Sequence, residues 1–197
     1  MIDQSKVIFV QILDMERYDG IYDKHGHKVD DYAHAGGSWP DEGKFEQFNF
    51  RNIEGKCLGY LPPYSKVDLK RINPREVKLD QHKKKYLDHV LIVFTTSVKN
   101  QGRYICGFYV NARLFESPID NKLEERKLNN GQFAQFSAIV HAQNAYLLNR
   151  SERVMRIENG RKKIGGFGQS NMWYADQNLE YRKELIQYIE KVIEEKK

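Results

Sequence analysis

Two long apolar stretches separated by a short polar turn lie in the middle of the chain. They are HVLIVFTTSV at 89–98 and YICGFYVNARLF at 104–115, with KNQGR between them. β-Branched and aromatic residues favour strands, and Asn100 with Gly102 suits a tight turn. The pattern predicts an antiparallel hairpin at the centre of a sheet.

Shorter runs of the same kind predict more strands and an α+β, β-rich fold. KVIFVQIL (6–13) is expected to form a central strand, and Gly55 to turn a hairpin between 45–53 and 57–61. The segment from Asp19 to Lys44 is the longest irregular region. Further strands are expected at 66–72 and 133–141, and a connection or short helix at 73–85. Segment 142–148 is compatible with a short helical turn and is left open.

The last twenty residues predict an amphipathic helix. Apolar residues recur at helical spacing with Glu and Lys on the opposite face, and Asn178 suits the N-cap. We therefore divide the chain into a β-rich domain, 1–177, and a C-terminal helix, 178–197. The helix either caps the sheet or leads into a further domain. Its apolar positions are Leu185, Ile186, Ile189, Val192 and Ile193.

Cysteine usage and the N-terminus indicate the compartment. Cys57 and Cys106 lie in apolar, strand-like runs, where free cysteine behaves as a small hydrophobe. The apolar run that begins at Val7 is too short for a signal peptide or a membrane span. We expect a cytoplasmic protein without a membrane partner.

The chain carries 32 Lys and Arg against 27 Asp and Glu, a net charge of +5. A basic excess favours a polyanionic partner, although solvated turns and strand faces give the same composition. The cations form three bunches: Lys66, Lys70 and Arg71; Lys83, Lys84 and Lys85; and Arg150, Arg153, Arg156, Arg161, Lys162 and Lys163.

The motifs of common catalysts are absent, and no cofactor is expected. The pattern G-x-S-x-G is missing, and so are the P-loop and a complete set of carboxylates for a nuclease metal. One alternative is a metal site formed by His25, His27 and His34, because an H-x-H pair can bind one zinc ion. Surface histidines in a turn are the other interpretation.

The segment GGFGQSNMWY (165–174) is the best candidate for ligand contact. Its glycines allow close approach of another molecule. Gln169 and Asn171 offer the donor and acceptor that a base edge requires, and Trp173 and Tyr174 offer stacking faces. The alternative is a structural turn in which Trp173 fills the core.

Two further places carry candidate contacts. In GFYVNAR, alternation puts Tyr109, Asn111 and Arg113 on one face of a strand. These residues either read a base or phosphate, or tie a loop to the sheet. Trp39 lies in the loop sequence GGSWP, where an aromatic residue has few core neighbours and is suited to stacking.

Four elements together resemble a family: FEQFNFRNIEGKCLGYLPP, HVLIVFTT, GFYVNARLF and GGFGQSNMWY. They resemble the N-terminal recognition modules fused to HNH-type and other modification-dependent restriction nucleases, which look like PUA-superfamily domains of the EVE and YTH kind. The chain has two Trp residues, and the spaced tryptophan cage of the YTH readers is not identified.

The resemblance implies a bent antiparallel or mixed β-barrel with flanking helices, and an aromatic-lined pocket for a flipped, modified base. The base contacts that it implies are Trp39, Tyr109, Asn111, Gln169, Ser170, Asn171, Trp173 and Tyr174, and the phosphate contacts are Arg113, Arg153, Arg161 and Lys162.

The leading hypothesis is a non-catalytic nucleic-acid-binding module, with DNA favoured over RNA, that reads a modified base in restriction or defence. A fused or associated nuclease or motor domain is the expected partner. One alternative is a small metal-dependent hydrolase or nuclease that uses the His25, His27 and His34 loop. Another is a protein-interaction domain whose C-terminal helix carries assembly.

Overall fold

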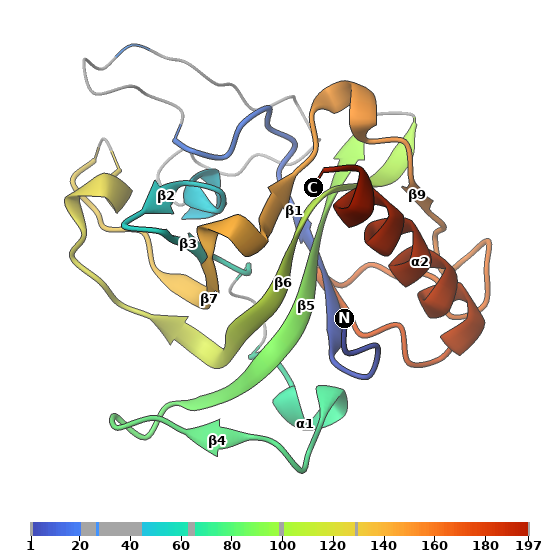
Figure 1. The fold of residues 1–197 in the computed structure, drawn as a ribbon, viewed down its shortest axis with the longest axis horizontal. Coiled ribbons are helices and arrows are strands. Elements are labelled where there is room, and N and C mark those ends of the chain that lie inside the picture. Colours follow the sequence, from blue (N-terminus) through green and yellow to red (C-terminus); the bar gives the residue numbers. More distant parts are fainter. Residues whose placement is uncertain are drawn as a thin grey trace.

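The strands of the described residues form one mixed sheet (Figure 1). This computed structural model describes residues 2–20, 27, 45–62, 66–98, 101–128 and 130–196. The strands are β1 (Val7–Ile12), β2 (Asn52–Ile53), β3 (Lys56–Gly59), β4 (Lys78–Leu79), β5 (Lys85–Val98), β6 (Gly102–Ile119), β7 (Phe136–His141), β8 (Ala145–Leu147), β9 (Arg156–Ile157) and β10 (Met172–Trp173).

The helices of the described residues are α1 (Leu69–Ile72) and the longer α2 (Leu179–Glu195). Neither is both long and apolar enough to cross a membrane. Short 3-10 turns are η2 (Phe45–Phe48), η3 (Glu124–Arg126), η4 (Ala142–Asn144) and η5 (Arg150–Glu152).

The β5–β6 hairpin confirms the predicted centre of the sheet and is longer than the sequence pattern. β1 pairs parallel with β5, and β4 pairs antiparallel with the opening residues of β5. β7, β8 and β9 all pair with β6. The path runs β10-β1-β5-β6-β7-β3-β2, so β1 lies one strand in from an edge.

The expected closed barrel is wrong for the part of the chain that the structure describes. β10 and β2 lie at opposite ends of the strand path and do not pair. Each contributes only two residues, which leaves little backbone to join the edges. The sheet is therefore open, and bulges between β5 and β6 bend it.

Apolar residues cover both faces of the sheet. Successive side chains of β1 illustrate this, because they belong in turn to two different core clusters. Ile8 and Val10 belong to one core cluster, and Phe9 belongs to the other. α2 covers the second face with Leu185, Ile186 and Ile189. Its predicted N-cap is confirmed, since the Asn178 side chain accepts a hydrogen bond from the Tyr181 N–H. The division into two domains stays a prediction.

Three local expectations differ from the structure. The stretch 66–72 holds the short helix α1 instead of a strand, because the Asp68 side chain caps the Arg71 N–H. The stretch 73–85 contains β4 instead of only a connection or helix, and 45–48 is the 3-10 turn η2. The open segment 142–148 divides into η4 and β8.

Arg126 joins the β2–β3 end of the sheet from inside. Its side chain is fully buried, and its guanidinium donates to the carbonyls of Phe48, Leu58, Ala134 and Gln135 at 2.6 to 3.3 Å. No carboxylate of the described residues pairs with it, and burial lowers its pKa to about 10. These bonds hold η2, β3 and the approach to β7 together.

We expect Arg126→Met to lower the free energy of unfolding by about 3 kcal/mol or more, because buried carbonyls lose their donor. Urea denaturation followed by circular dichroism measures the change. Arg51→Met is the matched control, since Arg51 is less buried and donates to a single carbonyl, that of Glu125. Equal losses in the two variants would contradict this role for Arg126.

Candidate nucleic-acid interface

Trp173 lies in the core. This agrees with the alternative interpretation of segment 165–174, a structural turn in which Trp173 fills the core. Its exposed fraction is 8%. Its ring centroid lies 4.7 Å from that of Phe9, 5.5 Å from that of Phe167 and 5.9 Å from that of Tyr181. β10 brings it there by pairing with β1. The ring therefore has no free face for stacking on a base, which corrects that expectation.

Tyr174 is also held by the protein itself. It is 9% exposed, and its hydroxyl accepts a 2.8 Å hydrogen bond from the Asp68 N–H. The Arg71 guanidinium lies over its ring at 4.5 Å. Tyr174 thus anchors α1 to the end of β10, and its expected role as a base-stacking face is corrected too.

Two glycines of the segment, Gly165 and Gly168, differ in what surrounds them. Gly165 has φ +75°, and a Cβ there would lie 2.6 Å from the Cβ of Asn178. Close approach at Gly165 is therefore to the start of α2 and not to a ligand. A Cβ at Gly168, in contrast, would meet nothing within 4 Å.

The middle of the segment is the part that remains available. Gln169 and Ser170 are exposed, and Asn171 is half-buried. The Ser170 hydroxyl oxygen accepts from the Met172 N–H at 3.1 Å, and the Asn171 carbonyl accepts from the Gln11 N–H at 2.8 Å. These two bonds fix the turn, and the exposed Gln169 amide has no hydrogen-bond partner among the described residues.

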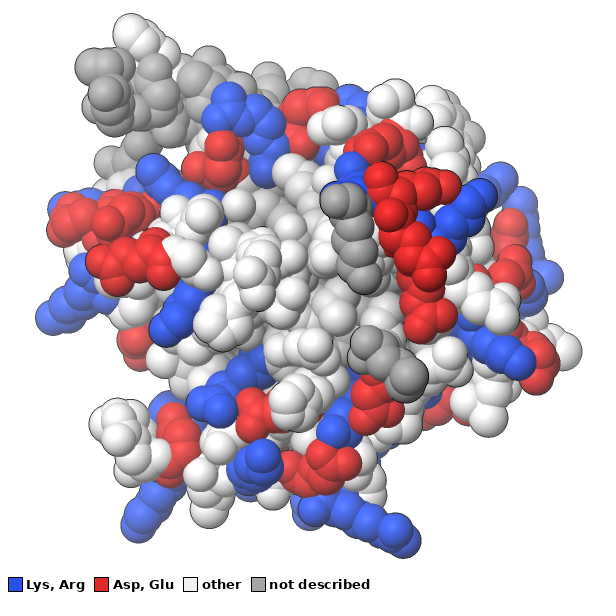
Figure 2. All heavy atoms as spheres, viewed as in Figure 1, with Lys and Arg blue, Asp and Glu red and all other residues white. Residues whose placement is uncertain are grey.

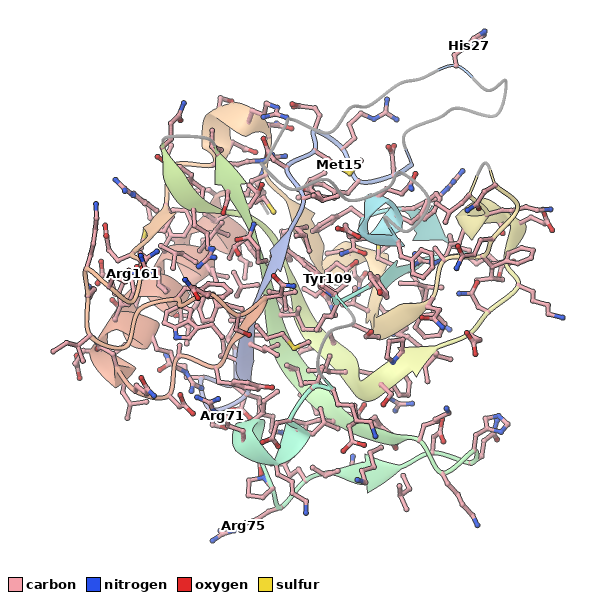
Figure 3. All side chains as sticks on the ribbon, turned by 180° about the vertical axis from the view of Figure 1, so that it is seen from behind. Met15, His27, Arg71, Arg75, Tyr109 and Arg161 are labelled. Atoms are coloured by element: carbon pink, nitrogen blue, oxygen red, sulfur yellow. The ribbon has the colours of Figure 1, made fainter. Side chains whose placement is uncertain are left out.

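Tyr109 lies inside the sheet's first core cluster, contrary to its expected place on a polar face (Figure 3). Its ring contacts Phe50 and Phe94, and burial raises its pKa well above the usual value. Between Val90↔Ala112 and Ile92↔Tyr109 the register shifts. This bulge puts Tyr109 and Ala112 in the same cluster and so reverses the predicted alternation.

Asn111 and Arg113 are exposed next to this bulge. Asn111 has φ +58°, a conformation that Asn tolerates better than most residues. Arg113 donates to the Asp88 carboxylate at 2.8 Å and lies over Tyr86 at 4.2 Å. Burial alone would raise the pKa of Asp88, but bonds from Arg113 and Lys78 lower it. The charge expected for a phosphate is thus already balanced at Arg113.

Arg153 is a structural residue and not the expected phosphate contact. It is 8% exposed. Its guanidinium pairs with the buried Asp14 at 3.0 Å and donates to the carbonyls of Leu148 and Glu16. Arg150 bonds the same Asp14 carboxylate at 2.8 Å. The Asp14 carboxylate therefore binds both arginines, and these ion pairs hold η5 against the end of β1.

Arg161 and Lys162 lie on an exposed turn, and their role as phosphate contacts stays a prediction. Both are exposed, and within the described ranges neither has a carboxylate at ion-pair distance. The Asn159 side chain accepts from the Arg161 N–H at 2.9 Å. The turn is held by backbone and amide groups, so the two charged ends face solvent.

Arg103 is a candidate that the sequence interpretation missed. Its Nε donates to Gln11 Oε1 at 2.5 Å, and its guanidinium lies 3.7 Å from the Phe167 ring centroid. No carboxylate in the described part of the chain pairs with it, and burial lowers its pKa to about 10. In the sequence it is one arginine after a turn, so no pattern marks it.

Several of the exposed cations without a carboxylate partner in the described residues follow one edge of the molecule. The side chain of Asn178 ties the loop that carries Arg161 to α2, and Asp176 bonds Arg71 of α1. Figure 3 shows Arg161, Arg71 and Arg75 in that order down this edge. We define the basic band by its exposed cations without a carboxylate partner in the described residues: Arg161, Lys162, Lys70, Arg75, Lys83 and Lys84.

The two sides of the molecule differ in charge. In Figure 2, Lys and Arg side chains extend from the lower edge, over α1 and the β4–β5 hairpin, with carboxylates between them. Asp and Glu gather along α2. On the face that Figure 2 shows, the charges of the described residues are therefore unevenly distributed.

A cavity of about 360 Å³ lies between the segment after β1, the β2–β3 hairpin and the η4–β8 segment. The Asp19 carboxylate at its rim accepts from Arg17 at 2.6 Å, and its second oxygen is buried without a partner in the described residues. The floor is apolar. The lining residues are Arg17, Asp19, Phe50, Asn52, Cys57, Ala142, Ala145 and Leu147.

Most of the alternative metal site lies outside the described residues. His25, His34 and Trp39 lie outside the described residues, whereas His27 is described. Within the described ranges, no group of three or more His, Cys, Asp or Glu side chains could hold a metal ion.

Comparison with protein-family models, with curated protein sequences and with solved structures found no match for this chain. The resemblance to PUA-like recognition modules therefore stays a prediction.

We expect Trp173→Phe to lower the free energy of unfolding by roughly 1–3 kcal/mol, because a smaller ring leaves part of the core unfilled. Gln169→Ala should leave stability unchanged, since Gln169 is exposed. Urea denaturation measures both. Unchanged stability in Trp173→Phe would contradict the assignment of this ring to the core.

Proposed function

We propose that this protein is a non-catalytic nucleic-acid-binding module of the cytoplasm, with DNA favoured over RNA. It works beside a fused or associated nuclease or motor domain in restriction or defence. The single observation that supports binding is the basic band, whose cations lack carboxylate partners within the described residues.

The band suits a polyanion because its charges are not balanced within the protein. A carboxylate partner would have to be displaced before a phosphate could bind, as at Arg113 and Arg153. No such exchange is needed at Arg161, Lys162, Lys70 or Arg75. Each phosphate contact also releases a counterion, which makes the binding depend on salt.

Arg103 strengthens the proposal beside segment 165–174. Its half-buried guanidinium has neutral acceptors only, namely Gln11 and the Phe167 and Gly168 carbonyls. A buried cation is stabilised when an anion supplies the missing charge. The exposed Gln169 and Ser170 lie on the same segment as Gly168 and add neutral donors for a phosphate or a base edge.

Affinity for a labelled DNA oligonucleotide should fall steeply as salt rises, and Arg161→Ala/Lys162→Ala should reduce the slope of log K against log salt by about 2. Fluorescence anisotropy over a salt series measures both quantities. Parallel titrations with RNA of the same sequence test the preference for DNA.

Lys191→Ala is the matched control for that experiment. Lys191 is exposed on α2 and pairs with Glu195 at 3.8 Å, so its removal should leave the salt slope unchanged. Absence of binding at low salt would contradict the proposed function. Equal salt slopes in all variants would show that Arg161 and Lys162 do not contact the DNA.

The base-reading part of the proposal is supported by the cavity. Phe50, Ala142 and Leu147 provide apolar surface for a planar ring, and the Asp19 side chain, which is 37% exposed, is a polar acceptor among the lining residues. The volume lies at the lower end of the range for small-ligand pockets, about 300–1,000 Å³. A flipped, modified base has the size and the polar edge that this site suits.

Among oligonucleotides that carry 5-methylcytosine, 5-hydroxymethylcytosine, 6-methyladenine or no modification, we expect one modified form to bind most tightly. Ala142→Trp should fill the cavity and abolish that preference, while binding of the unmodified strand persists. His141→Trp places the same ring at an exposed position that does not line the cavity. Competition binding measures the preference among these oligonucleotides. A preference that persists in Ala142→Trp would contradict the assignment of base reading to this cavity.

A further inference from the structure

The β4–β5 hairpin projects from the sheet as an arm (Figure 1). We define the arm as residues 78–86, in which Leu79 pairs with Lys85 and Lys78 pairs with Tyr86. Every position of the arm from Lys78 to Lys85 is exposed except Asp80, which is half-buried. Residues 78–85 therefore pack against no apolar layer of the described residues, and Tyr86 at the base joins a core cluster.

Ion pairs at its base hold the arm in place. Lys78 and Arg113 both bond the Asp88 carboxylate, and Lys85 bonds Glu116 at 3.1 Å. The guanidinium of Arg113 also lies over Tyr86. The arm is thus attached rigidly through the neighbouring strand β6, and its inner cations are neutralised.

The turn at the tip is equally well fixed. Asp80 Oδ1 accepts from the N–H groups of His82 and Lys84, both at 2.8 Å, and Lys83 N–H donates to the Asp80 carbonyl. Lys83 has φ +59°, in the left-handed region that favours glycine. A lysine therefore occupies a strained position where glycine would fit better.

The tip and its flank present a specific chemistry. Lys83 and Lys84 have no carboxylate partner among the described residues, as the definition of the basic band requires. Beside them, Leu79 is 62% exposed. One exposed leucine is ordinary on a surface, but here it lies on a protruding two-stranded ribbon whose tip carries the unpaired Lys83 and Lys84. A two-stranded ribbon fits a groove of duplex DNA.

We propose that the arm enters a groove of double-stranded DNA, where Lys83 and Lys84 bind phosphates and Leu79 wedges against a base step and bends the duplex. This inference rests on the proposed nucleic-acid-binding function. Apolar side chains inserted between base steps are known to kink duplexes, and the cations at the tip supply charge complementarity to the two phosphate backbones.

Bending is the readout that separates the wedge from simple attraction to phosphates. A duplex of about 30 base pairs carries a donor dye and an acceptor dye at its two ends, and energy transfer should rise when the full chain binds. Leu79→Ser should return the transfer to that of the free duplex and weaken duplex binding about tenfold. Affinity for the single strand should not change.

Leu123→Ser is the matched control, because Leu123 is another exposed leucine but lies before η3, outside the arm. It should leave bending and affinity as in the wild type. Lys83→Gly is a second, independent variant. It should raise the urea midpoint of unfolding, since glycine relieves the left-handed backbone, and lower duplex affinity, since a phosphate contact is lost.

The outcomes of this experiment are distinct. Loss of bending in Leu79→Ser but not in Leu123→Ser supports the arm. Salt-dependent binding of the wild type without any bending overturns the arm and leaves the proposed function standing. Equal bending by wild type and Leu79→Ser also overturns it. No binding of either strand form at low salt overturns the proposed function itself.

Discussion

The β5–β6 hairpin is the constraint on which the rest of the fold depends. β1 and β4 pair with β5, and β7, β8 and β9 pair with β6, so five strands take their place from it. Its bulges break the register three times. Because each slip moves side chains to the other face, the hairpin also decides which residues reach the core and which reach solvent.

This dependence explains how far the sequence could predict the fold. The hairpin and α2 were predicted correctly, since β-branched runs and a helical apolar stripe are strong local signals. Tyr109 was misplaced because a bulge has no such signal, and 66–72 was misassigned because one capping bond at Asp68 outweighed the apparent alternation. The closed barrel failed for a nonlocal reason, the shortness of the edge strands β2 and β10.

The candidate site was predicted less well, because its residues are selected by partners that lie far away in the chain. Arg153 and Arg161 look alike in the sequence, yet Arg153 pairs with Asp14 whereas Arg161 pairs with no described carboxylate. Trp173 was expected to have a free face, but both faces of the sheet are covered and β10 draws the ring beneath α2. Of the described candidates, Gln169, Ser170, Asn111, Arg113, Arg161 and Lys162 are exposed, although Arg113 is paired with Asp88; Asn171 is half-buried.

The carboxylates, more than the cations, define the basic band. Asp14, Asp88 and Asp176 each bond arginines that a count of charges would assign to a phosphate. Once these arginines are neutralised, the unpaired cations of the basic band remain along the edge that runs from Arg161 through α1 to the arm, while α2 presents acidic side chains. A polyanion approaching this molecule is therefore attracted to one edge and repelled from the helix. That asymmetry supplies an orientation, which net charge alone does not.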